Sequence, residues 1–191
     1  MATATSDTPQ RILDIAERLV QTRGFNGFSY ADIAEAMNVT KASLHYHFRG
    51  KADLGKSLIQ RYEKNFLAAL AGIDAATKDA REKLRRYAAI YGSVLQDDRM
   101  CLCGMLAAEF GTLPEAMRTE MRHYFDANEH WLAGVLKQGK KDKTLSFSGS
   151  PAETAQSLIG SLEGAMMMAR SYQDPARFRS VSERLVSGLA A

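Results

Sequence analysis

The chain has 191 residues, 46% of them hydrophobic, and is therefore long enough to bury a core in one or two domains. No apolar run approaches the roughly 20 residues of a transmembrane helix, and the start, MATATSDTPQ, lacks the basic and apolar regions of a secretory signal. We therefore expect a cytoplasmic protein without a membrane partner. The formal charge of +3 is too small to indicate a partner by itself, so the local placement of charge must decide.

Apolar residues recur at helical spacing along almost the whole chain, and no stretch alternates with the two-residue period of a strand. This pattern predicts an all-α fold. The first helix is expected over about residues 9–23, because Thr8 and Pro9 form a typical helix start and Gly24 follows its last apolar position.

Two short helices are predicted next, with a tight turn between them. Ser29 with Asp32 forms a capping-box-like start for a second helix that runs to about residue 37. Asn38 favours the left-handed conformation that ends a helix, and Thr40 can cap a third helix over about residues 40–47.

The third helix is expected to have an inner and an outer face. It is too short to be stable alone, so the first two helices should hold it through Val39, Leu44 and Phe48. Its outer face offers cations and hydrogen-bond donors without a carboxylate, which favours a polyanion over a basic loop between core helices. At helical spacing, one of its two histidines should face the helix bundle. The residues of this face are Lys41, Ser43, His45, Tyr46 and His47.

Such a pair of helices is typical of a helix-turn-helix, whose second helix enters the DNA major groove. Residues 28–54, FSYADIAEAMNVTKASLHYHFRGKADL, resemble the DNA-binding region of the TetR family of bacterial transcriptional regulators. The resemblance implies base or phosphate contacts from Thr40, Ser43 and Tyr46, and a contact of Lys51 with the DNA backbone. The full expected set of DNA-binding residues is Ser29, Thr40, Lys41, Ser43, His45, Tyr46, His47 and Lys51.

A long fourth helix is predicted to begin at Lys51 and to link the two halves of the chain. We expect a helix-turn-helix domain over residues 8–54 and a larger helical domain over residues 55–191, which binds an effector and forms the dimer. Apolar periodicity predicts the later helices, separated by a polar loop over 139–151, at about 80–97, 102–110, 114–138, 152–172 and 175–189.

Side chains of the larger domain are candidates for a pocket that binds a small apolar or aromatic effector. Most such residues are simply core in any helical protein. The candidates are Tyr62, Phe66, Tyr87, Tyr91, Cys103, Phe110 and Phe125.

Cys101 and Cys103 are the only cysteines, and they lie too close together for a disulfide framework. The pair is too small a ligand set for zinc unless His123, His130 or a partner chain contributes, so we expect no metal and no cofactor. Buried, inert thiols are the plain interpretation. The alternative is a repressor that senses oxidants or electrophiles through a thiolate, which requires a lowered thiol pKa.

Gly160, Gly164 and Met168 follow one another at four-residue spacing on one helical face, which is small enough for close approach of another helix. The resemblance implies that the last two helices pair with their copies in a four-helix bundle, so we expect a homodimer. Packing within the chain is the alternative.

No Gly-rich phosphate loop, H-E-x-x-H pair or nucleophile elbow occurs, so an enzyme is not expected. The sequence predicts a regulator that binds a double-stranded DNA operator, and a repressor that a small effector releases from an inverted repeat. Two other classes stay open, namely a helical enzyme with a basic segment and a DNA-binding protein without a sensing role.

Overall fold

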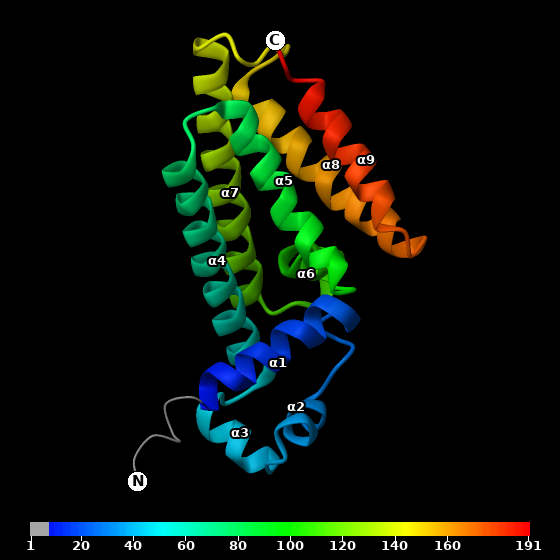
Figure 1. Cartoon of the computed structure of the whole chain (residues 1–191). Coiled ribbons are helices and arrows are strands. Elements are labelled where there is room, and N and C mark those ends of the chain that lie inside the picture. The colour runs from blue at the N-terminus through cyan, green and yellow to red at the C-terminus, as the bar shows by residue number, and fades with distance from the viewer. Residues whose placement is uncertain (1–7) are drawn as a thin grey trace. The chain divides into compact units, whose positions relative to one another are not determined.

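The computed structural model describes residues 8–191. The first seven residues, for which the sequence predicts no secretory signal, lie outside the described residues. Within residues 8–191 the chain forms nine α-helices, one 3-10 helix and no strand (Figure 1). An isolated bridge joins Leu145 and Ala190. The predicted all-α fold is confirmed. No helix in this part of the chain is both long and apolar enough to cross a membrane.

The helices lie close to the predicted ranges, with two differences. The helix expected to end near residue 138 continues to Lys141. Lys140 and Lys141 lie in its last turn, where positive charges interact favourably with the negative end of the helix dipole. The helix expected over 102–110 is shorter and is followed by a 3-10 turn. The observed elements are α1 Thr8–Arg23, α2 Tyr30–Met37, α3 Lys41–His47, α4 Lys51–Ala76, α5 Ala80–Gln96, α6 Leu102–Ala108, η1 Phe110–Thr112, α7 Glu115–Lys141, α8 Pro151–Ser171 and α9 Pro175–Ser187.

The chain folds into two compact units. The first unit contains the described residues up to Lys64 together with Leu102–Tyr124, and the second contains Asn65–Cys101 and Phe125–Ala191. Both α4 and α7 therefore contribute residues to both units. The division by role at residues 54 and 55 stays a prediction.

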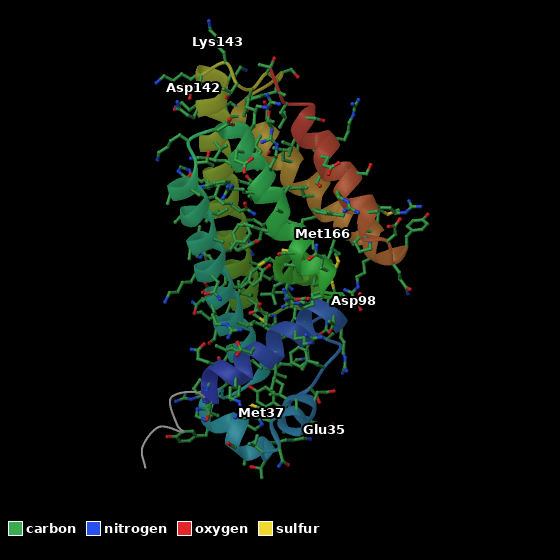
Figure 2. The ribbon with its side chains drawn as sticks, viewed as in Figure 1. Glu35, Met37, Asp98, Asp142, Lys143 and Met166 are labelled. Atoms are coloured by element: carbon green, nitrogen blue, oxygen red, sulfur yellow. The ribbon has the colours of Figure 1, made fainter. Side chains whose placement is uncertain are left out.

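The core of the first unit forms because α1 and α2 each bury one apolar stripe. α1 packs against α2 and α6, and α2 packs against α3. Arg61 of α4 adds ion pairs to α1, at 2.5 Å from Asp14 and 2.7 Å from Glu17. Figure 2 shows Met37, which is buried, and Glu35, which is exposed, in the last turn of α2. The buried residues of α1 and α2 include Ile12, Leu13, Ala16, Val20, Ile33, Ala34 and Met37.

The docking of α3 corrects one expectation. Leu44 is 1% exposed and is the buried residue of this helix. Phe48 is partly buried, whereas Val39 is 37% exposed and is not part of the buried core. Val39 follows the left-handed Asn38, and this sharp turn of the backbone leaves its side chain outside the core.

The second unit packs α5, α8 and α9 against one another (Figure 1). Its interior includes Met166 of α8, which is fully buried and labelled in Figure 2. A buried polar network links α5 to α7. The Tyr87 hydroxyl donates to Asn128 Oδ1 at 2.8 Å, and Asn128 Nδ2 donates to the Tyr91 hydroxyl at 3.1 Å. The buried amide is thus paired on both sides, as burial requires.

Candidate nucleic-acid interface

The tight turn between α2 and α3 has the predicted geometry. Asn38 is left-handed, with φ 55° and ψ 49°, and its N–H donates to the carbonyls of Ala34 and Glu35. Two residues later Thr40 caps α3, because its hydroxyl accepts a hydrogen bond of 3.3 Å from the Ser43 N–H. These local bonds set the direction of α3 relative to α2.

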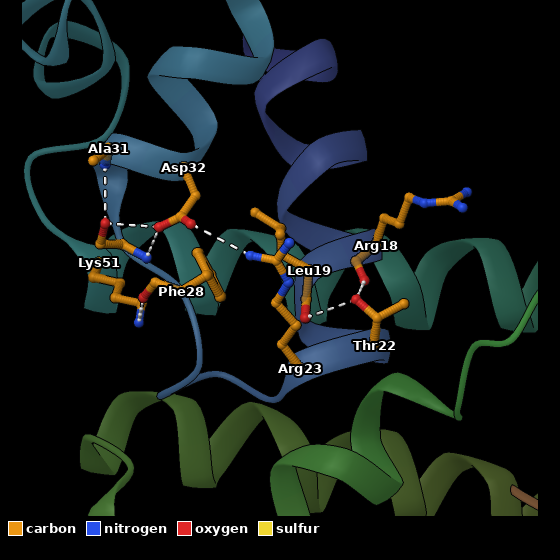
Figure 3. Close-up of polar contacts among 9 residues, drawn as sticks. Arg18, Leu19, Thr22, Arg23, Phe28, Ala31, Asp32 and Lys51 are labelled. Atoms are coloured by element: carbon orange, nitrogen blue, oxygen red, sulfur yellow. Dashed lines mark hydrogen bonds and ion pairs between the residues drawn. The ribbon is translucent and has the colours of Figure 1, made fainter.

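Ser29 caps the start of α2. Its hydroxyl accepts from the Ala31 N–H at 3.2 Å and donates to Asp32 at 2.8 Å. The Asp32 carboxylate also accepts from the Ser29 N–H, and this bond lowers the pKa of Asp32. Arg23 lies 3.4 Å from the same carboxylate (Figure 3). Ser29 therefore already has structural partners, and its contact with DNA stays a prediction.

The outer face of α3 is open in the described chain. Tyr46 is 85% exposed, Lys41 and His45 are also exposed, and Ser43 and His47 are partly exposed. No carboxylate occurs in the sequence between Glu35 and Asp53. A short helix anchored by one buried leucine thus presents donors and cations outward.

The two histidines of α3 differ in their surroundings. The His45 ring lies against the Tyr30 ring, with centroids 4.7 Å apart, and its Nδ1 is 3.2 Å from the Arg49 carbonyl. Tyr30 in turn donates to the Phe48 carbonyl at 3.1 Å, and burial raises its pKa to about 12. The His45 ring therefore contacts α2 although the residue is exposed, and which histidine faces the helix bundle stays a prediction.

Lys51 points into the protein. Its ammonium group donates to the carbonyls of Phe25 and Phe28 and lies 4.6 and 4.2 Å from the centroids of their rings. Figure 3 shows this contact with Phe28. Partial burial lowers the pKa of Lys51, although the charges of Glu109 and Asp32 act in the opposite direction. Its expected contact with the DNA backbone stays a prediction.

Sequence reasoning missed Glu109, which belongs to the same unit. Its carboxylate accepts hydrogen bonds from the backbone N–H of Phe25 at 2.6 Å and of Asn26 at 3.2 Å. Asn26 Nδ2 also donates to Thr112 Oγ1 at 2.7 Å. A lone glutamate at the end of a short helix carries no sequence signal for such a contact.

The residues expected to bind an effector divide between the two units. Phe66, Tyr87 and Tyr91 cluster in the second unit, with ring centroids 5.4 to 6.4 Å apart. Phe125 also belongs to this unit, whereas Tyr62, Cys103 and Phe110 belong to the first. Phe110 is 42% exposed beneath Arg118. Their common role in one pocket stays a prediction.

A cleft of about 480 Å³ lies between α5 and α9 of the second unit, and none of the expected effector-binding residues lines it. Its apolar lining includes Ala88, Gly92 and Phe178, and arginines from both helices also line it. Sequence reasoning did not predict this cleft.

Both cysteines are buried, Cys101 at 2% and Cys103 at 0% exposure. The Cys101 thiol donates to the Glu163 carboxylate, and burial raises the pKa of Glu163 to about 7. Within residues 8–191 no group of three or more His, Cys, Asp or Glu side chains could hold a metal ion.

The expected dimer face of α8 is exposed in the single chain. A Cβ atom on Gly160 or Gly164 would meet no atom within 4 Å, and Met168 is 55% exposed. Three further large apolar side chains of the last two helices and the turn between them are exposed, namely Met167, Tyr172 and Val181.

The capped turn and the outward basic helix place the chain among the helix-turn-helix DNA-binding proteins. Family models support this class along most of the chain. The model described as "Bacterial regulatory proteins, tetR family" matches residues 12–58, and "Tetracyclin repressor-like, C-terminal domain" matches residues 80–185. The chain belongs to the TetR family. It is a DNA-binding transcriptional regulator and not an enzyme.

Curated relatives span almost the same length. The chain is 27% identical to the HTH-type transcriptional repressor NemR of Escherichia coli, over 86% of this chain and 84% of that protein. It is 25% identical to the HTH-type transcriptional repressor DhaR of a Mycobacterium species, over 86% and 83%.

Solved structures share the fold over the whole described chain. A TetR-family regulator from Agrobacterium tumefaciens is 31% identical, with a TM-score of 0.94, and covers 97% of this chain and 99% of its own. A TetR regulator from Legionella pneumophila is 33% identical, with a TM-score of 0.88 and coverage of 98% and 100%.

Proposed function

We propose that the protein is a repressor that binds an inverted-repeat operator as a homodimer and releases it when a small molecule binds the second unit. The observation that carries the proposal is the outward face of α3, where an 85% exposed Tyr46 stands among cations and donors without a carboxylate. The curated relatives NemR and DhaR, which are named as repressors, support this direction of regulation.

The base-reading residues in this proposal are Thr40, Ser43 and Tyr46 at the exposed side of α3. Lys41 and His47 add cationic or donor groups beside them. α3 has seven residues, or about two turns, with Thr40 at its N-cap and Ser43 and Tyr46 within it, so these residues lie at the end of the helix and on the face that would approach base edges. Phosphates on either side supply the salt-dependent part of the affinity.

The dimer in this proposal forms through α8 and α9. An exposed stripe that contains Gly160, Gly164 and Met168 has the small side chains needed for close helix approach, and exposed Met167 and Tyr172 extend it. A two-fold dimer binds an operator whose half-sites are inverted copies.

The effector in this proposal is apolar or aromatic and binds beside the rings of Phe66, Tyr87 and Tyr91. The hydroxyls of both tyrosines and the Asn128 amide bond to one another, so the effector must exchange one of these hydrogen bonds for its own if it has a polar group. α4 directly follows α3 in the chain and contributes residues to both units. A ligand that displaces the part of α4 in the second unit therefore acts on the helix next to α3. The ligand must then bind the DNA-free state more tightly than the DNA-bound state.

Thiol sensing is the second candidate, and the placement of Cys101 beside Glu163 is the observation that bears on it. A solved structure of E. coli NemR in a reduced form is 25% identical to this chain, with a TM-score of 0.82. The burial of both thiols counts against rapid attack on an oxidant. Peroxide that releases operator DNA from the wild type but not from the Cys101→Ser, Cys103→Ser variant would favour this candidate.

The main proposal is tested by selecting operator sequences from a random double-stranded library with the wild-type protein. We expect enrichment of an inverted repeat and specific binding at least 1000-fold tighter than binding to unrelated DNA, within the usual range of about 10³ to 10⁷. Failure to enrich any sequence would contradict a role as an operator-binding repressor.

A further inference from the structure

Two charged side chains bind the backbone of the loop between α1 and α2. One is a carboxylate that accepts from its N–H groups, and the other is an ammonium group that donates to its carbonyls. The backbone N–H groups of Phe25 and Asn26 donate to the Glu109 carboxylate. The carbonyls of Phe25 and Phe28 accept from the Lys51 ammonium group. Four polar groups of a single loop are therefore satisfied by one anion and one cation from elsewhere in the first unit.

The loop needs these partners because its apolar residues are buried. Phe25 and Phe28 are 5% and 6% exposed, and their rings meet edge to face with centroids 5.9 Å apart. Burial of the rings removes water from the neighbouring peptide groups, which must then find hydrogen bonds inside the protein. Hydrogen bonds to a charged partner are the stronger kind.

Gly24 makes room for the carboxylate. Its φ of +82° lies in the left-handed region, and a Cβ atom built there would lie 2.6 Å from Glu109 Oε1. A side chain at this position would therefore be strained and would also push the carboxylate away from the loop. The glycine and the glutamate form one arrangement, although they lie far apart in the sequence.

The loop leads directly into the DNA-reading helices. Ser29, the cap of α2, follows Phe28, and only three residues separate α2 from α3. We propose that Glu109 and Lys51 are positioning residues, which clamp the α1–α2 loop and thereby hold α2 and α3 in the orientation that recognises the operator. This inference rests on the proposed role of α3 in operator binding.

The clamp also joins two regions that the family models separate. Lys51 lies within the match to the tetR-family DNA-binding model, whereas Glu109 lies within the match to the C-terminal domain model. In the structure, residues 102–124 nevertheless belong to the first compact unit. A residue of the C-terminal family domain thus helps to fix the geometry of the DNA-binding unit.

Glu109→Gln distinguishes a positioning role from a purely electrostatic one, because the two predict opposite changes in operator affinity. Removal of a negative charge from the DNA-binding unit should by itself tighten binding to every DNA. Loss of the charged clamp should instead weaken binding to the selected operator by about tenfold, since hydrogen bonds to charged groups are the more valuable ones. Binding to unrelated DNA should stay equal or become tighter. Glu115→Gln, which removes an exposed carboxylate from the same unit, is the matched control.

Lys51→Gln distinguishes the clamp from the phosphate contact that the family resemblance implies. A lost phosphate contact weakens binding to all DNA and reduces the slope of log affinity against log salt by about one. A lost clamp weakens operator binding and leaves the salt slope and binding to unrelated DNA unchanged. A slope reduced by about one would therefore assign Lys51 to DNA and overturn its part in the clamp.

A milder variant covers the case in which Glu109→Gln does not fold. Thr112→Val removes the hydroxyl that accepts from Asn26 and changes no charge, so it loosens the same loop from the same segment. We expect it to weaken operator binding about threefold, within the range of one ordinary hydrogen bond. All affinities are measured by fluorescence anisotropy on protein whose helicity matches the wild type by circular dichroism.

The outcomes separate the two proposals. If the wild type binds no selected operator, the proposed function fails. If the wild type binds its operator and Glu109→Gln and Thr112→Val bind it as tightly as Glu115→Gln does, the proposed function stands and the clamp is overturned.

Discussion

The Glu109 carboxylate accepts a hydrogen bond of 2.6 Å from the backbone N–H of Phe25, 84 residues earlier in the chain. This bond ties the end of α6 to the loop that precedes α2 and α3. α2 and α3 are therefore held both by their own turn and by a segment that comes much later in the sequence.

Tyr46→Ala should weaken operator binding about tenfold or more, because one good base contact contributes about 1–3 kcal/mol of discrimination. The free energy of unfolding should change by less than about 0.5 kcal/mol, since the side chain is 85% exposed. Anisotropy titrations and urea unfolding measure the two effects. Operator affinity equal to that of the wild type would remove Tyr46 from the interface.

Leu44→Ala should weaken operator binding through a loss of stability. Leu44 is the buried residue of α3, and its truncation should cost about 2–5 kcal/mol of unfolding free energy or detach the helix from the unit. Operator binding should fall because α3 loses its support. A variant that is as stable as the wild type in urea would show that α3 is held in another way.

Gly160→Leu and Gly164→Leu should disrupt the dimer without disturbing the single chain. A Cβ atom at either position meets no atom of the same chain within 4 Å apart from neighbouring parts of its own helix, so the added side chains begin in open space on the face proposed to meet the partner helix. Gly134→Leu in α7 is the control, because that glycine is also exposed and mid-helical with open space beside it. Light scattering measures the mass. Dimers in all three variants would exclude this face of α8.

Glu163 should make stability depend on pH. Burial raises its pKa from 4.5 to about 7, so between these values the folded state holds a proton that the unfolded state has lost. The free energy of unfolding should therefore fall as pH rises from about 4.5 to 7, by about 1–3 kcal/mol. Glu163→Gln should remove this part of the pH dependence and should be more stable than the wild type at neutral pH.

The control for this experiment is Glu183→Gln, which removes an exposed carboxylate from the same unit. Its urea midpoints between pH 4.5 and 8 should follow those of the wild type. Parallel curves for the wild type and Glu163→Gln would show that the carboxyl group is not held in a desolvated site.

Mild peroxide should leave operator binding of the wild type unchanged, because both thiols are buried. Iodoacetamide labelling under the same conditions should be slow in the folded protein and rapid in urea. Fast labelling of Cys101 in the folded state would revive the thiol-sensing candidate.

The sequence by itself determined α1, α2 and α3, because the features that predict these helices depend on residues close together in the chain. The apolar spacing of α1, the capping box of Ser29 and Asp32, and the turn at Asn38 and Thr40 each depend on neighbours within one helical turn. All three appear in the structure at the predicted positions. The family resemblance depends on the same stretch.

Only the tertiary structure decided which side chains meet across the chain. The sequence predicts that Lys51 is a surface cation beside DNA. In the structure its ammonium group instead donates to the carbonyls of Phe25 and Phe28. Glu109 has no signal in the sequence, because its partners are backbone N–H groups of a distant loop, and every residue type except proline supplies those. Helical periodicity specifies the face on which a residue lies, but the partner opposite that face depends on how the helices pack.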